Sequence, residues 1–278
     1  MQPAPVQPPP SPTSAATAAG PQHAFSVGGV LSRTFSTWSR HLVAFSILTV
    51  LAAAPFVLLA IFGDTPIPGL TAPPQSPLDA AAGAPPPQLP QGFWLAYLAS
   101  MLLFVVEVGA ITHGVIHHLA GKRVSLGAMI GAGLRRAIPL LVVGVLSYLA
   151  VSVGMVLLLV PGVIVACSLA VAIPAVVVER PGVFGALRRS SALTKGKRLA
   201  ILAVFLVLGV IAVAVSLAGS MVLPALTGSF APMLGTVLGL VVNVVFGTLF
   251  WVAPGVVYHD LRVAKEGVAT AQLAAVFE

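Results

Sequence analysis

Long apolar runs separated by short polar segments make up most of the chain from residue 42 to residue 258. A helix needs about 20 such residues to cross the roughly 30 Å of hydrocarbon in a bilayer. Two of the runs are far longer than this, and each has a helix-breaking sequence near its middle, Pro161-Gly162 in one and Thr227-Gly228-Ser229 in the other. The pattern therefore predicts six transmembrane helices, at about residues 42–62, 93–117, 138–160, 162–178, 199–223 and 232–258.

The segments outside these spans have a different composition. Residues 1–24 are rich in Pro, Ala, Ser and Gln and contain no Lys or Arg, which indicates a disordered tail and not a signal peptide. Residues 64–91 are rich in proline, which excludes a buried helix and predicts a loop outside the membrane. We therefore expect a membrane domain at residues 25–262, followed by a short tail at residues 263–278.

The composition identifies lipid as the solvent of this fold. Hydrophobic residues make up 58% of the chain, charged residues only 8%, and the mean hydropathy is +1.04. A soluble domain carries roughly 25% charged residues, because its surface faces water. The predicted fold class is an all-α integral membrane protein.

The basic residues predict how the spans are oriented. All 14 Lys and Arg residues lie before the first span, between the second and third, between the fourth and fifth, or after the sixth. Short loops rich in Lys and Arg remain in the cytoplasm. The proline-rich loop on the opposite side carries Asp64 and Asp79 instead. Both termini, including the tails at residues 1–24 and 263–278, are therefore expected to be cytoplasmic.

Three cytoplasmic segments begin in a similar way, which suggests an internal repeat. Ser26-Val27-Gly28, Ser125-Leu126-Gly127 and Val183-Phe184-Gly185 each lead through a short amphipathic stretch into an odd-numbered span. We predict three hairpins that share one direction across the membrane, each preceded by an amphipathic helix at the cytoplasmic interface. The alternative is a chance similarity within a sequence rich in Val, Ala and Gly.

The third of these segments carries the densest group of cations. On a helical wheel Val183, Phe184, Ala186, Leu187 and Leu193 share one face. Cations on the other face of such a helix attract anionic lipid headgroups, by about 1 kcal/mol each. The residues predicted to contact lipid or a protein partner are Arg188, Arg189, Lys195, Lys197 and Arg198. The alternative is that these charges only set the orientation of the spans.

Glu107 is the only acidic residue inside a predicted span, and Asn243 in the sixth span is a possible hydrogen-bond partner. The pair can act as a polar lock between helices, or Glu107 can carry a proton or bind a substrate. His113 and His117 lie four residues apart at the end of the second span. No further ligand completes a metal shell around them, so we expect no metal and no cofactor.

Two stretches, residues 174–196 and 257–267, carry a resemblance to a known family. The sequence resembles an uncharacterised prokaryotic membrane family often labelled as the membrane domain of glycerophosphoryl diester phosphodiesterases, over residues 25–270. The residues that carry the motif are Pro174, Glu179, Arg180, Tyr258, Asp260, Arg262, Glu266 and Gly267. The catalytic domain of those enzymes is a soluble barrel of about 250 residues, for which six spans leave no room. The resemblance implies a helical module in a prokaryotic cytoplasmic membrane that sometimes accompanies a lipid-related enzyme.

These features favour a non-enzymatic scaffold or a lipid-interacting accessory module. The expected partners are membrane lipids, anionic headgroups among them, and a membrane or envelope protein. A nucleophile–base pair is not recognisable, and the cations lack the aromatic platform typical of nucleic-acid binding. The alternative function is a transporter of small solutes or lipids that uses Glu107.

Overall fold

The computed structural model describes residues 25–62, 89–227 and 232–267, and all regular secondary structure in these ranges is α-helical. Six helical segments are long and apolar enough to cross a membrane. The predictions of an all-α fold and of a multi-pass membrane protein are therefore confirmed. The predicted tail at residues 1–24, most of the loop at residues 64–91 and the end of the chain lie outside the described ranges.

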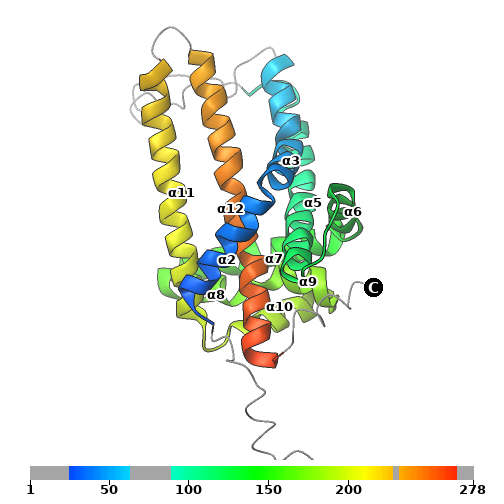
Figure 1. Ribbon diagram of the computed structural model, residues 1–278. Helices are drawn as coiled ribbons and strands as arrows, with labels where there is room; N and C mark the ends of the chain where they lie inside the picture. Colours follow the sequence, from blue (N-terminus) through cyan, green and yellow to red (C-terminus); the bar gives the residue numbers. More distant parts are fainter. Residues whose placement is uncertain (1–24, 63–88, 228–231, 268–278) are drawn as a thin grey trace, which may run out of the picture.

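Four long helices run alongside one another, as Figure 1 shows. They are α3 (Leu42–Phe62), α5 (Phe93–Leu119), α11 (Arg198–Thr227) and α12 (Pro232–Glu266). Helix α12 contacts the other three, so it forms the centre of the bundle. It also continues to Glu266, past residue 258 where the last span was predicted to end. Its last turns are held by ion pairs and by packing on α9 and α10, which a count of apolar residues does not detect.

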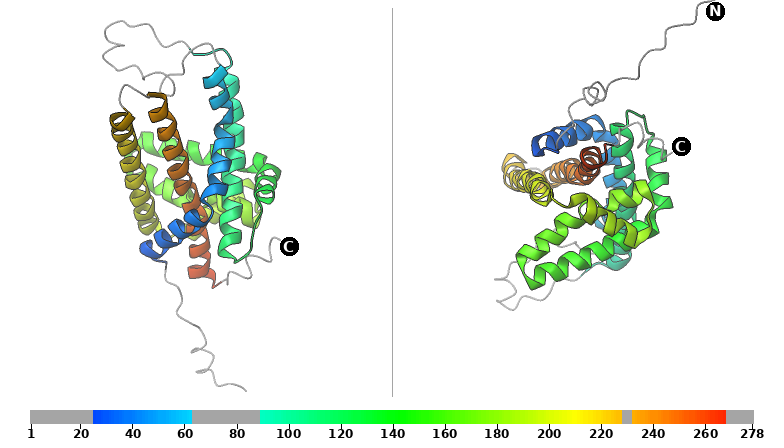
Figure 2. Two further views of the ribbon diagram at one scale, coloured as in Figure 1. Left: turned by 45° about the horizontal axis from the view of Figure 1, so that its top comes forward. Right: turned by 90° about the horizontal axis from the view of Figure 1, so that it is seen from below.

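The second hairpin along the chain is oriented differently from the other two. It consists of α7 (Ala137–Leu157) and α8 (Leu159–Leu169), which lie across the direction of α11 and α12; Figure 2 shows these last two end-on in its right-hand view. We predicted that all three hairpins share one direction, and the α7–α8 hairpin does not. Two hairpins, α3–α5 and α11–α12, share a direction, and the third packs crosswise against them.

The turn between α7 and α8 lies at Leu158, whose backbone is extended, and not at Pro161-Gly162 as predicted. Proline is tolerated in the first turn of a helix, because the N–H that it lacks has no partner there. Pro161 accordingly lies inside the first turn of α8. Gly162 lies against Gly154 of α7, where a Cβ would overlap the backbone of Met155, so this glycine serves close packing and not a turn.

The predicted fourth span is interrupted between α8 and α9 (Ala172–Glu179). Ser190 holds the interruption together: its hydroxyl accepts a hydrogen bond from the Val171 N–H at 3.3 Å and donates one to the Ser168 carbonyl at 2.7 Å. Pro174 lies in the first turn of α9 and is buried. It therefore occupies a position that proline favours and does not break a helix.

A short helix precedes each hairpin at the predicted positions. These helices are α2 (Val27–Arg40), α6 (Leu126–Arg135) and α10 (Gly182–Thr194). Ser26 and Ser125 cap the first two by accepting hydrogen bonds from the N–H groups of Gly29 and Ala128. Their position at the membrane interface stays a prediction.

Helix α10 buries only part of the predicted apolar face against the rest of the protein. Ala186 and Leu193 are buried, but Phe184 is 78% exposed. Ser190 and Thr194, which were not assigned to the buried face, are fully buried and bond to the Ser168 carbonyl. The helix therefore packs against the interrupted α8–α9 segment through a face that is partly polar.

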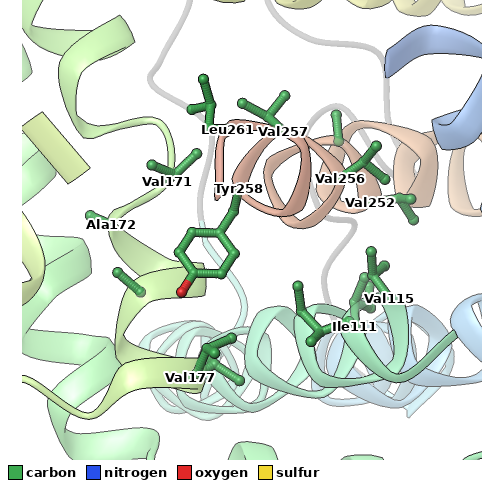
Figure 3. Close-up of a cluster of buried hydrophobic side chains, with 14 of the residues drawn as sticks. Ile111, Val115, Val171, Ala172, Val177, Val252, Val256, Val257, Tyr258 and Leu261 are labelled. Atoms are coloured by element: carbon green, nitrogen blue, oxygen red, sulfur yellow. The ribbon is translucent and has the colours of Figure 1, made fainter. Parts of the chain in front are cut away.

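The hydrophobic core lies where α5, α9 and α12 meet. Figure 3 shows Tyr258 of α12 among valines and isoleucine of the neighbouring helices, and its side chain is completely buried. Val115 contacts the Cα of Gly255 so closely that a Cβ there would lie 2.9 Å from its Cγ1. This packing fixes the height of α12 relative to α5, and with it the position of the charged residues that follow Tyr258.

Candidate functional site

The C-terminal turns of α12 form an ion network with α9 and α10, at the lower end of the molecule in Figure 1. Arg189 of α10 lies at its centre. Its Nε is 2.7 Å from Oε2 of Glu179 and its Nη2 is 2.5 Å from Oε1 of Glu266. Tyr258 donates a hydrogen bond of 2.7 Å to Glu179, and Arg262 contacts Glu266 at 2.9 Å. The charges of two carboxylates and two guanidinium groups thus compensate one another, as expected of an ion network that stabilises the fold.

The network holds Arg189 in its charged form. Burial alone would lower the pKa of this guanidinium, but its hydrogen bonds to Glu179 and Glu266 raise the pKa above its ordinary value. The side chain is therefore held by its two carboxylate partners and is only partly exposed. The prediction that Arg189 contacts lipid or a partner is not supported by this position.

The other predicted contact residues of this segment are arranged differently. Arg188 and Lys195 are exposed, whereas Lys197 and Arg198 are partly buried. The Nε atom of Arg198 is buried without a hydrogen-bond partner among the described residues. Lys265 of α12 donates to the carbonyls of Ala192 and Lys195, at 3.0 and 2.7 Å, and so caps the C-terminus of α10. Of the predicted set, Arg188 and Lys195 are thus the best placed to meet an external ligand.

A second ion pair ties the first helix to α12. Arg33 of α2 donates to Oδ2 of Asp260 from Nε at 3.1 Å and from Nη2 at 2.5 Å. The Asp260 side chain is 5% exposed, and its other oxygen lies 3.2 Å from Nδ1 of His259. An anion this deeply buried needs such partners, so α2 is held in a fixed place on the bundle.

The motif residues therefore converge in space. Five of them, Glu179, Tyr258, Asp260, Arg262 and Glu266, belong to the two ion clusters. Arg180 and Gly267 have positive φ angles, of 55° and 61°, at the ends of α9 and α12. Arg33 was not predicted to take part, because a partner 227 residues away along the chain gives no local signal.

Glu107 is buried inside the bundle, 3% exposed. Its carboxylate accepts a hydrogen bond from the Thr49 hydroxyl of α3. The partner predicted for it, Asn243, has a side chain outside the described part of the structure. Thr49 was not identified from the sequence, because threonine in an apolar run is common and gives no distinct pattern. The contact joins α3 to α5 in the manner of a polar lock.

A cavity of about 800 Å³ opens between α2, the start of α3 and the end of α5. Arg40, Lys122 and Arg123 line it, together with a histidine pair in which Nε2 of His41 lies 3.0 Å from Nδ1 of His118. Burial, and then the charge of Arg40, lowers the pKa of His41 below its ordinary value. None of the described residues that line it is acidic, so the cavity is suited to an anion.

A second cavity, of about 670 Å³, lies between α5, α6, α9 and the start of α7. Three arginines, Arg135, Arg136 and Arg180, line it with His113 and His117. Its described lining residues again include no acidic side chain. In the part of the chain that the structure describes, no group of three or more His, Cys, Asp or Glu residues could hold a metal ion.

Comparison of the chain with protein-family models, with curated proteins and with solved structures found no match. The resemblance to the membrane family, over residues 25–270, therefore rests on the motif residues alone and stays a prediction.

Proposed function

We propose that this protein is a non-enzymatic membrane module that binds anionic lipid headgroups at the end of its helices where the cations gather. The role follows the sequence-based expectation of a lipid-interacting accessory protein, and it keeps the prediction of a cytoplasmic membrane with both termini inside. In this role the ion clusters hold the fold together and the cavities provide the binding surface.

The observation that carries the proposal is the uneven pairing of charges at this end. Arg33, Arg189 and Arg262 have carboxylate partners. The arginines of the second cavity and Arg40 and Arg123 of the first have no ion pair within the described ranges, and no described acidic residue lines either cavity. Basic pockets between helix ends on the cytoplasmic side are typical of sites for anionic headgroups.

The proposal is tested by the lipids that the protein retains. Purification in native lipid discs, followed by mass spectrometry of lipids and proteins, should show anionic phospholipids enriched over the surrounding membrane. Changing Arg40 and Arg123 to Gln should reduce the enrichment. The charge-preserving changes R40K and R123K are the matched control and should retain it. Retained lipids with the composition of the bulk membrane would reject the proposal.

The same experiment distinguishes the scaffold variant of this function. A protein recovered in constant proportion with the wild type, and lost when exposed Arg188 and Lys195 are changed to Gln, would identify a partner docked on α10. We leave Arg189 unchanged in this variant because its ion pairs stabilise the fold.

The transporter alternative depends on Glu107. Its hydrogen bond with Thr49 gives the carboxylate a structural partner, which favours the lock. A site that moves solute also needs polar groups near the middle of the membrane. Measurement of solute flux in proteoliposomes, with wild-type protein and with E107Q, tests this alternative directly.

A further inference from the structure

Three arginines line the second cavity, and none of them has a carboxylate partner among the described residues, whereas Arg33 of the first cavity bonds to Asp260. Arg135 and Arg136 lie at the junction of α6 and α7, and Arg180 follows the last residue of α9. His113 and His117 complete the polar lining from α5. The remaining lining residues are alanine, proline, valine and glycine, which present little that could neutralise a positive charge.

Among the described residues, no carboxylate pairs with the arginines of this cavity. Of the seven acidic residues in the chain, three lie outside the described ranges. Glu179 and Glu266 bond to Arg189 and Arg262, and Asp260 bonds to Arg33. Glu107 accepts from Thr49. Although Glu179 precedes Arg180 in sequence, its carboxylate is bonded to the ion network.

The neighbouring positive charges affect the guanidinium of Arg136. Burial, followed by the charges of Arg180 and Arg135, lowers the pKa of its guanidinium below the ordinary value. Its Nη1 donates to the Val176 carbonyl at 3.2 Å, a neutral acceptor that leaves the charge in place. An anion in the cavity would relieve the repulsion among the three arginines.

The backbone at Arg180 provides an independent observation. Arg180 is the only described residue other than glycine with a positive φ, at 55°. Helix ends in this conformation usually carry glycine, because a side chain is strained there. Such strain is retained where the side chain has a use. Here it brings a guanidinium to the wall of the cavity.

We propose that this cavity, lined by Arg135, Arg136 and Arg180, binds a phosphate group, supplied by the headgroup of an anionic phospholipid. Guanidinium groups bind phosphate oxygens in pairs of parallel hydrogen bonds, which makes arginine the preferred residue for such recognition. The site rests on the proposed function and names its ligand. All three arginines flank candidate membrane spans, Ala137–Leu157 and Leu159–Glu179, so the phosphate would lie at the boundary of the hydrocarbon, where lipid phosphates lie.

The test uses R180G. Glycine accepts the positive φ without strain, so this variant should fold at least as stably as the wild type while it loses one guanidinium. We measure binding of phosphatidylglycerol to the full chain in neutral detergent micelles by native mass spectrometry. R180G should bind at least roughly tenfold more weakly, since hydrogen bonds between charged groups contribute this much.

R188A is the matched control, because it removes one exposed arginine from the same end of the protein but outside the cavity. A neutral micelle has no charged surface to attract Arg188, so its binding should remain within about twofold of wild type. R135Q changes a second arginine of the cavity and should weaken binding like R180G. Wild-type affinity in both R180G and R135Q would overturn the site while leaving lipid binding elsewhere intact.

A second set of measurements distinguishes a lipid ligand from soluble phosphate. It also shows whether the phosphate site can stand if the proposed function fails. Wild-type protein that shows no preference for phosphatidylglycerol over phosphatidylcholine would reject the proposed function. In that case inorganic phosphate decides: if it raises the melting temperature of the wild type but not of R180G, the phosphate site is supported with a soluble ligand. If inorganic phosphate stabilises neither protein, the site is rejected as well.

Discussion

Glu179 is the residue on which the ion network depends, because one side chain accepts hydrogen bonds from both Arg189 and Tyr258. Changing it to Gln keeps the shape and removes the charge. We expect E179Q to lower the free energy of unfolding by about 1–2 kcal/mol, a value reduced by partial exposure of the network. Thermal unfolding in detergent measures the loss. R188Q, on the exposed side of the same helix α10, should unfold like the wild type, and equal stability of E179Q would show that the network does not hold α12.

Glu107 provides a second test at a single side chain. E107Q keeps an oxygen that can accept from the Thr49 hydroxyl, so stability should stay within about 0.5 kcal/mol of the wild type. T49V removes the donor and leaves the carboxyl group without this partner, which should cost about 1–2 kcal/mol. Unfolding in lipid discs measures both variants. The lock would be contradicted if T49V were as stable as the wild type.

The motif identified the acidic and aromatic members of the clusters, but their partners followed only from the fold. Glu179, Tyr258 and Asp260 stand out in the sequence because polar residues at the end of an apolar run are conspicuous. Arg33 and Thr49 do not, since each is one of many similar residues and meets its partner through distant packing. The cavities are likewise invisible in the sequence, because segments far apart along the chain form each of them.

Helix α6 is held against α5 by a very close approach of two backbones. A Cβ at Gly133 would overlap the carbonyl oxygen of Val106, so G133A should force the helices apart. We expect the free energy of unfolding to fall by about 1–3 kcal/mol, as for other overpacked contacts.

Gly131 of the same helix provides the matched control. A Cβ there would meet only the end of the Arg135 side chain, at 3.8 Å. G131A should therefore stabilise the protein slightly, by about 0.5–1 kcal/mol, because alanine favours the helix over glycine. The same unfolding measurement serves both variants, and a G133A protein as stable as G131A would contradict the close contact.

The existence of the long helices could be predicted from the length of the apolar runs, whereas the bends between them could not. Proline and glycine at 161 and 162 suggested a turn, yet both also suit the first turn of a helix. The interruption before α9 depends on Ser190, a residue of another helix. Local sequence therefore determines where a helix can form, and contacts between segments determine where it ends.

The crosswise hairpin α7–α8 changes what the whole molecule presents to the membrane. Both of its ends lie beside the cation-rich segments, so the predicted orientation of the termini is the same whether or not the hairpin crosses the bilayer. Its tip is apolar throughout: Leu157, Leu158, Leu159 and Val160 are each about 70% exposed. A turn that faced water would normally carry polar residues. The tip is therefore expected to lie among acyl chains and not in the aqueous phase beyond the membrane.

Cysteine labelling in intact cells measures this placement. Cys167 is the only cysteine, so it is first replaced by serine, and L158C is then introduced at the tip. We expect a membrane-impermeant maleimide to leave L158C unlabelled from outside, because the α7–α8 hairpin lies across the upright helices. S76C, in the loop predicted to be extracytoplasmic, is the positive control, and R188C, predicted to be cytoplasmic, is the negative control. Labelling of L158C as strong as that of S76C would place the turn beyond the far side of the membrane and restore six full crossings. An unlabelled L158C beside a labelled S76C would mean that the turn does not reach the far side of the membrane and that the α7–α8 hairpin is not a full crossing.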